Sequence, residues 1–146
     1  MTTTMTRRIE LLDPKRVKEL WPSIEPLVHR VVQNSSHAPD PLDAEGIWHA
    51  AVHGVCHVLA FYEGDDLAMV LAFEFGRSKG ARTATILAVA GRDLTAFKAA
   101  FWPSILAWFK ENGAQYVDAY AEPRLARIYL RKFGFTETCS YVRMAL

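Results

Sequence analysis

Three apolar stretches in the middle of the chain constrain the fold more than any other feature. Val55–Glu63, Leu67–Arg77 and Arg82–Ala90 are rich in apolar and β-branched residues. Two short segments join them, residues 64–66 and 78–81, and both have the composition of hairpin turns. The stretches therefore predict three consecutive antiparallel strands.

Segments with helical periodicity flank this group of strands. On the N-terminal side the pattern predicts a strand and then two helices: Ile9–Leu12, Lys15–Gln33 and Leu42–His53. On the C-terminal side it predicts a helix, a strand, a helix and a strand: Asp93–Asn112, Tyr116–Ala121, Pro123–Lys132 and Glu137–Ala145. A strand, helix, strand succession of this spacing favours a parallel pair with a right-handed crossover. We therefore expect an α+β fold, with helices flanking a mixed, mostly antiparallel sheet.

Prolines modify two of the predicted helices. Because proline inside a helix costs about 3 kcal/mol, Pro22 and Pro26 predict that the regular part of the first helix begins near Pro22. For the same reason, Pro103 predicts a kink or break in the helix that starts at Asp93.

The length and charge of the chain narrow the class of protein. Its 146 residues predict a single domain over residues 1–146, with residues 1–8 as a flexible or partner-bound arm. Seventeen Lys and Arg against sixteen Asp and Glu argue against a dedicated nucleic-acid binder. The longest apolar run, Leu67–Phe73, is too short to span a membrane. Cys56 and Cys139 lack metal-site spacing and indicate reduced thiols. These features predict a soluble cytoplasmic protein.

The segment Arg127–Phe135 and the order of the predicted elements carry a family resemblance. They resemble the GCN5-related N-acetyltransferase (GNAT) superfamily, which usually has a helix of the form Asn-x-x-Ala-x-x-Leu-Tyr-x-Lys-x-Gly-Phe. Aligned on Gly134 and Phe135, this sequence supplies Ala126 and Lys132 in register. Gly134 also permits a left-handed helix stop, after which Phe135 is expected to be largely buried. The resemblance implies transfer of an acyl group to an amine, with acetyl-CoA or another acyl-CoA as cofactor.

One departure from the family pattern concerns the acid that protonates the leaving thiolate. The tyrosine that often has this role is replaced by Leu130. Tyr129 lies one residue earlier, rotated by about 100° around the helix. Tyr129 is therefore the candidate acid, and the alternative is a packed aromatic residue with its hydroxyl at the surface.

A second departure lies in the segment after the strand Arg82–Ala90. Family members usually read Arg/Gln-x-x-Gly-x-Gly/Ala there, and backbone N–H groups of that loop wrap the coenzyme A pyrophosphate. This sequence has one glycine in a shorter loop. The resemblance implies that Val89, Gly91 and Arg92 bind the cofactor. Asp93 or Thr95 is alternatively a helix N-cap.

Acyl transfer to an amine requires a base that takes the amine proton. In the predicted strand Tyr116–Ala121, the period of two places Asp118, Tyr120 and Glu122 on one face. Glu122 is the first candidate for the base, because it falls at the strand end that opens into a cleft at a parallel step. Asp118 is the second candidate, and Tyr120 is expected to contact substrate. The alternative is a solvated face that pairs with arginines of the next helix.

Glu74 and His53 are further candidates for contact with the substrate. Glu74 stands between two phenylalanines in a predicted strand. His49, His53 and His57 are four residues apart, a spacing that suits a metal on one continuous helix. Because Gly54 is expected to end that helix, no metal site is predicted. The second helix borders the acceptor cleft in the GNAT superfamily, which suggests a substrate-side role for His53.

Two functions therefore stay open. The first is an acyl-CoA-dependent N-acyltransferase that acts on a small-molecule or protein amine, with no nucleic acid or membrane as a partner. The second is a catalytically inactive binding or assembly protein of the same fold, including a phage-encoded, virion-associated protein.

Overall fold

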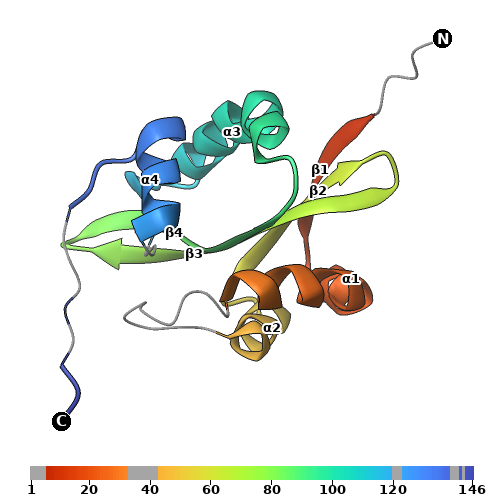
Figure 1. Ribbon diagram of the computed structural model, residues 1–146, viewed down its shortest axis with the longest axis horizontal. Coiled ribbons are helices and arrows are strands. Elements are labelled where there is room, and N and C mark those ends of the chain that lie inside the picture. Colours follow the sequence, from red (N-terminus) through yellow and green to blue (C-terminus); the bar gives the residue numbers. More distant parts are fainter. Residues whose placement is uncertain (1–5, 33–42, 120–122, 139–141, 143) are drawn as a thin grey trace.

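A computed structural model describes residues 6–32, 43–119, 123–138, 142 and 144–146 of the chain (Figure 1). Its elements follow the order expected from the sequence up to the fourth helix. They are β1 (Arg7–Leu12), α1 (Pro14–Val32), α2 (Ala44–Val52), β2 (His57–Glu63), β3 (Asp66–Ser78), β4 (Ala81–Gly91), α3 (Leu94–Glu111), β5 (Tyr116–Ala119) and α4 (Pro123–Lys132).

The five strands form one sheet in the order β1-β2-β3-β4-β5. β1 to β4 pair in antiparallel fashion, and β5 pairs with β4 in parallel. The predicted mixed, mostly antiparallel sheet is therefore confirmed. Helices α1 and α2 cover one face of the sheet, and α3 and α4 lie on the other (Figure 1).

The two faces of the sheet carry two different cores. Under α1 and α2 lies a core of mostly branched and small side chains, called here the aliphatic core, which includes Val17, Ile24, Val28, Ile47, Val58 and Val70. Under α3 and α4 lies a core rich in rings, called here the aromatic core, which includes Phe61, Phe73, Phe97, Trp102, Phe109 and Tyr129.

The expected late start of the first helix is wrong, because α1 is continuous from Pro14. The Asp13 carboxylate accepts a hydrogen bond of 2.8 Å from the backbone N–H of Arg16 and so caps the first turn. Pro22 and Pro26 both lie on the exposed side of α1. Carbonyls that lose a helical partner on that side can bond to water, so the helix tolerates both prolines.

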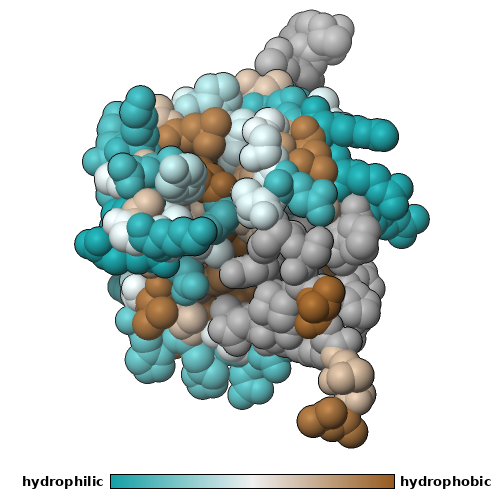
Figure 2. Space-filling model, turned by 90° about the vertical axis from the view of Figure 1, so that its left-hand side faces the viewer, coloured by the Kyte–Doolittle hydropathy of each residue, from teal (hydrophilic) through white to brown (hydrophobic). Residues whose placement is uncertain are grey.

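Two expectations for the C-terminal half are also corrected. Helix α3 is continuous through Pro103, which lies on its exposed side. No strand occurs in the described part of the predicted strand 137–145, and residues 139–141 and 143 lie outside the described residues. Val142, Met144 and Leu146, at the end of the chain, are exposed, and Figure 2 shows hydrophobic residues projecting at this end.

The end of α4 matches its prediction only in part. Gly134 adopts the expected left-handed conformation, with φ of 75°. Phe135 is half-buried instead of largely buried, with its ring centroid 5.0 Å from that of Tyr129 and 6.4 Å from that of Trp102. Among the described residues, no helix has both the length and the apolar character needed to cross a membrane.

Candidate functional site

A β-bulge at Leu87 creates the feature around which the site is built. Phe73 pairs with Ile86, whereas Ala72 pairs with Ala88, so Leu87 is the extra residue of β4. A bulge bends its strand, and the extra residue shifts the alternation of side chains, so that even-numbered residues face one side of the sheet before it and the other side after it. Ile86 accordingly belongs to the aromatic core, whereas Ala88 belongs to the aliphatic core. The described pairing of β4 with β5 also ends at Ile86, so β4 turns where that pairing stops.

Beside this turn lies a cavity of about 90 Å³ between the end of β4, α3 and α4. Its volume is that of roughly three waters, at about 30 Å³ each. The lining side chains are apolar apart from those of Tyr129, with its hydroxyl, and Trp102, with its indole N–H. The lining residues are Met69, Leu71, Ile86, Val89, Gly91, Leu94, Phe97, Trp102, Ile128, Tyr129 and Phe133. A space of this size and polarity suits a small acyl group.

Tyr129 lines the cavity, and Leu130 does not. Tyr129 is 7% exposed, whereas Leu130 is 38% exposed. Burial raises the pKa of Tyr129 to about 12, so its phenol stays protonated at neutral pH. The one-residue shift from the family pattern therefore leaves a tyrosine on the inner side of α4. The Tyr129 ring also packs on those of Phe133 and Phe135, so the alternative of a packed aromatic residue stays open beside the role of acid.

The predicted cofactor loop begins at Gly91, where any side chain would force the neighbouring backbone to move. Gly91 has φ of 138°, and a Cβ at this position would collide with the Ala68 carbonyl oxygen and lie 2.5 Å from Met69 Cα. The next backbone N–H, that of Arg92, donates to the same Ala68 carbonyl at 2.9 Å. The loop is therefore held against the start of β3, and the Arg92 amide is engaged within the protein.

The Arg92 side chain is engaged as well. Its Nε lies 3.5 Å from Oε1 of Glu63, and the Arg7 Nε lies 3.8 Å from Oε2 of the same carboxylate. The Glu63 side chain is only 8% exposed, whereas that of Arg92 is 58% exposed. Glu63 is a site residue that the sequence analysis did not find. No sequence signal marks its pairing with Arg92, because the two residues are distant in the chain and meet only where the loop returns to β3.

Asp93 occupies the N-cap position of α3 without capping it through its side chain. It is in the left-handed region, with φ of 65° and ψ of 45°, and makes no side-chain capping bond. Its carbonyl accepts the N–H of Phe97 at 3.1 Å. The first turn of α3 contains no acidic residue. Amide groups at a helix N-terminus favour negative charge, so this end of α3 is suited to an anion.

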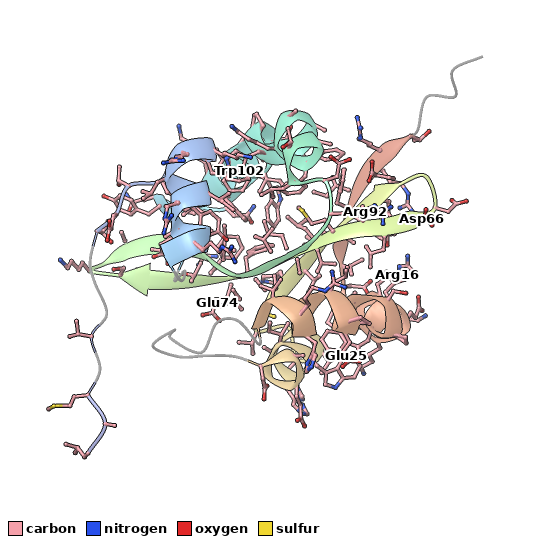
Figure 3. The ribbon with its side chains drawn as sticks, in the orientation of Figure 1. Arg16, Glu25, Asp66, Glu74, Arg92 and Trp102 are labelled. Carbon is pink, nitrogen blue, oxygen red and sulfur yellow. The ribbon has the colours of Figure 1, made fainter. Side chains whose placement is uncertain are left out.

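On the opposite face of the sheet, a polar row crosses three strands. Glu74 on β3 pairs with Thr85 on β4, which pairs with Asp118 on β5. The Thr85 hydroxyl donates a hydrogen bond of 2.6 Å to the Asp118 carboxylate. Figure 3 shows Glu74 on the side of α2 and Trp102 on the opposite side, that of α3. These residues are called here the carboxylate row. Thr85 and Asp118 pair one residue before Ile86 and Ala119, which are the last described pair of β4 and β5.

Two of the predicted site residues, Tyr120 and Glu122, lie outside the described part of the chain, so their predicted roles are unchanged.

The Cys56 thiol, which lies in the aliphatic core, has its pKa raised to about 11 by burial and secondarily by Glu74. A thiol with so high a pKa is a poor nucleophile at neutral pH.

His53 follows α2 as its C-cap residue. Its Nδ1 lies 2.7 Å from the His49 carbonyl oxygen, and the two imidazole centroids are 6.5 Å apart. His57 is instead the first residue of β2 and packs on Phe73. Within the described ranges, no group of three or more His, Cys, Asp or Glu is placed to hold a metal ion.

Several acetyltransferases of low sequence identity are among the solved structures that share this fold. The ribosomal-protein-alanine N-acetyltransferase of Brucella melitensis biovar Abortus 2308 is 14% identical, with 96% of this chain and 99% of that chain covered and a TM-score of 0.63. An aminoglycoside acetyltransferase from an uncultured soil metagenomic sample, in complex with sisomicin, is 15% identical, with 96% of each chain covered and a TM-score of 0.63. A predicted acetyltransferase with acetyl-CoA from Clostridium acetobutylicum is 14% identical, with 96% of each chain covered and a TM-score of 0.62.

These similarities confirm the expected GNAT fold across nearly the whole chain. No family model matches the sequence. No match is found among curated proteins.

Proposed function

We propose that this GNAT-fold protein is an N-acyltransferase that takes an acyl group from acyl-CoA, or a related pantetheine thioester, and transfers it to an amine. One observation carries the proposal. Ile86 lines the apolar cavity on one face of the sheet, and its neighbour Thr85 belongs to the carboxylate row on the other face, beside the end of the described β4–β5 pairing. A thioester held in the cavity is proposed to meet the amine at this end of the pairing.

The carboxylate row prepares the amine. At neutral pH most amines carry a proton and are not nucleophilic. Glu74 or Asp118 can attract the ammonium group and then take its proton, directly or through one water. Glu122, at the expected end of the same polar strand face, stays the first candidate that the sequence indicates for this role. Tyr120 and His53 are proposed to contact the rest of the amine substrate.

The reaction forms one bond and breaks one. The neutral amine attacks the thioester carbonyl carbon, the C–N bond forms, and the C–S bond breaks. The nitrogen loses one proton to the carboxylate or to water as the amide forms. The thiolate leaves with the electron pair of the C–S bond and takes up one proton from water, so that the two proton transfers balance. The cavity is proposed to hold the acyl group, and Val89 and Gly91 to lie along the pantetheine arm. Arg92 and the start of α3 are proposed to meet the phosphates.

Tyr129 is proposed to stabilise the leaving sulfur. Because burial raises its pKa to about 12, its phenol is protonated throughout the neutral range. A thiol with an ordinary pKa near 8.5 is the stronger acid, so the contribution of Tyr129 is a hydrogen bond to the thiolate as charge develops. Groups aimed at developing charge in a water-poor site are among the larger catalytic contributions.

The neighbouring structures support this class of reaction and two kinds of acceptor. One neighbour is named for acetylation of aminoglycosides and another for acetylation of ribosomal-protein alanine. A third is described with acetyl-CoA. The fold therefore accommodates both small-molecule and protein amines, and the carboxylate row of this chain suits a cationic acceptor of either kind.

An inactive binding or assembly protein is the second candidate, and the loop favours it. The Arg92 amide is bonded to Ala68 and its side chain is paired with Glu63, so less of this loop is free to bind a pyrophosphate than the family pattern implies. A virion-associated role belongs to this second candidate.

Calorimetric titration with acetyl-CoA separates the two. The enzyme proposal predicts a micromolar dissociation constant, followed by release of free thiol when amines are added. Tyr129→Phe should then lower kcat by about tenfold to a hundredfold with little change in acetyl-CoA affinity. The exposed residue Tyr116 provides the control substitution, Tyr116→Phe. No heat with millimolar acetyl-CoA, and none with a protein-bound phosphopantetheine thioester, would reject the enzyme proposal in favour of the binding protein.

A further inference from the structure

Helix α4 exposes positive charge that the proposed reaction does not use. Arg124, Arg127, Arg131 and Lys132 are exposed, and α4 contains no acidic residue. They form what is called here the basic stripe, because residues three and four apart lie on one side of a helix. Among the described residues, none of the four makes an ion pair. The net charge of the whole chain is only +1, so the positive charge is local to this helix.

The same helix forms a wall of the cavity. Ile128 and Tyr129 line the cavity from within α4, and Phe133 lines it directly after the helix. The Lys98 Nζ of α3 lies 5.8 Å from the centroid of the Phe133 ring, which adds a fifth cation near the end of the stripe. Figure 2 looks onto the side of the molecule that carries α4, where hydrophilic side chains gather. The basic stripe therefore lies on the exposed side of the same helix whose inner side lines the cavity.

The loop at the end of β4 provides much less positive charge for phosphates. Arg92 is its cation, and this side chain is paired with the largely buried carboxylate of Glu63. Free coenzyme A carries a pyrophosphate and a ribose phosphate. A phosphopantetheine group attached to a protein carries one phosphodiester. The charge of the loop therefore suits a protein-attached phosphopantetheine group better than free coenzyme A. The positive charge on α4 suits the surface of an acidic protein.

We propose that the acyl donor is presented as the phosphopantetheine thioester of an acidic carrier protein, which docks on the basic stripe. The inference rests on the proposed function and names the source of its acyl group. Opposite charges across an interface raise the association rate and set the orientation of the partners. Docking at α4 would place the pantetheine arm beside Tyr129. The transfer is the one described above, and the thiol product remains attached to the carrier.

Binding measurements with two donors test the inference. The probes are the acyl carrier protein of a bacterial fatty-acid synthase, with and without its phosphopantetheine group, and free coenzyme A. We expect the phosphopantetheine-bearing carrier to bind more tightly than either the unmodified carrier or coenzyme A. The double variant Arg127→Glu, Arg131→Glu should weaken carrier binding by roughly tenfold or more, because rim charges set association with an oppositely charged partner.

Two controls accompany this variant. Lys15→Glu, Lys18→Glu makes the same change of charge at exposed residues of α1, on the other side of the sheet, and should leave carrier binding within about twofold. Arg127→Gln, Arg131→Gln removes the charge without reversing it and should give an intermediate loss. Thermal melts check that all variants fold.

The outcomes separate the inference from the proposed function. Coenzyme A that binds at least as tightly as the carrier, and that loses the same affinity in the reversal variant, would assign the stripe to free coenzyme and overturn the inference alone. If the α1 control loses as much carrier affinity as the α4 variant, the inference is also overturned, because the loss would then follow the net charge of the protein and not the basic stripe. If neither the carrier nor coenzyme A binds at millimolar concentration, the proposed function itself fails.

Discussion

The two faces of the sheet are filled by different kinds of side chain, and the difference bears on where a ligand fits. The aliphatic core interlocks small and branched residues such as Val28 and Ile47, each 1% exposed. The aromatic core stacks rings edge to face, with the Phe61 and Phe97 centroids 5.6 Å apart and those of Phe73 and Phe109 4.9 Å apart. The cavity lies on the aromatic side, where Phe97, Trp102 and Phe133 are among its lining residues.

β4 takes part in both cores, and the change occurs at its bulge. Ala84 and Ile86 contribute to the aromatic core, and Ala88 and Ala90 contribute to the aliphatic core. The cavity lies beside this change, with Ile86, Val89 and Gly91 in its wall. The aromatic core therefore leaves room for a ligand beside β4, whereas the opposite face carries the aliphatic core and the carboxylate row.

The largest effect is expected from removing a ring at the cavity. Phe97 is 1% exposed and lines the cavity, so Phe97→Ala should lower the free energy of unfolding by about 3–5 kcal/mol. It should also enlarge the space proposed for the acyl group and shift preference from acetyl-CoA toward butyryl-CoA. Urea denaturation and titration with both thioesters measure these effects.

Ile24→Ala is the matched change in the aliphatic core. Ile24 is 0% exposed, and its truncation should cost about 2–5 kcal/mol. Because Ile24 lies on the far side of the sheet from the cavity, the acyl preference should not change. A shift in preference as large as that of Phe97→Ala would contradict the functional distinction between the two cores.

A substantial part of the architecture could be predicted from the sequence, because local patterns determine it. The two short turns define the three consecutive antiparallel strands β2, β3 and β4. The strand, helix, strand succession correctly predicts the parallel pairing of β4 and β5. The bulge at Leu87 could not be predicted, since no glycine or change of period marks it. The continuity of α1 through Pro22 depends on which side of the helix is exposed, and this requires tertiary structure.

The site could be predicted less fully than the fold. Tyr129, Gly91 and Val89 could be found because they stand next to recognisable motif positions, and all three line the cavity. Glu63 could not be found, because its partner Arg92 is distant in sequence and the contact depends on how the loop returns to β3. The roles proposed for these residues remain predictions.

The second largest effect is expected at the glycine where β4 ends. Gly91→Ala should destabilise the protein by about 3 kcal/mol, because its positive φ is strained for alanine and its Cβ meets the backbone of Ala68 and Met69. The comparison is Gly80→Ala, also at positive φ but with nothing within 4 Å of the added Cβ, which should cost about 1 kcal/mol. Equal losses in urea denaturation would mean that the close approach to β3 is not needed.

Arg92→Ala tests the loop beside the cavity. We expect coenzyme A to bind about tenfold more weakly, equivalent to about 1.4 kcal/mol, because one charge-assisted phosphate contact is lost. The matched variant is Arg7→Ala, which removes the other cation beside Glu63 but lies on β1. Calorimetry should show at most about a twofold change for Arg7→Ala. Similar affinities for both variants would reject this loop as the phosphate site.

The smallest effect compares the two cores through their titratable groups. Cys56 lies in the aliphatic core with its pKa raised to about 11, and Tyr129 lies in the aromatic core with its pKa raised to about 12, both chiefly by burial. A group whose pKa is higher in the folded state than in the unfolded state contributes stability at low pH. That contribution is lost as the pH rises from the unfolded pKa through the folded pKa.

Cys56 should therefore begin to cost stability near pH 9, and Tyr129 only near pH 10. At pH 10 the Cys56 contribution to the loss should be about 1 kcal/mol, on the scale of 1.36 kcal/mol per unit of pKa. Cys56→Ala should flatten the unfolding free energy between pH 9 and 10, whereas Tyr129→Phe should flatten it above pH 10. Since the pKa of Tyr62 is also raised by burial, the measured quantity is the difference between each variant and the parent. A parent curve that Cys56→Ala leaves unchanged would mean that water reaches the thiol and that the aliphatic core is less closed than its packing indicates.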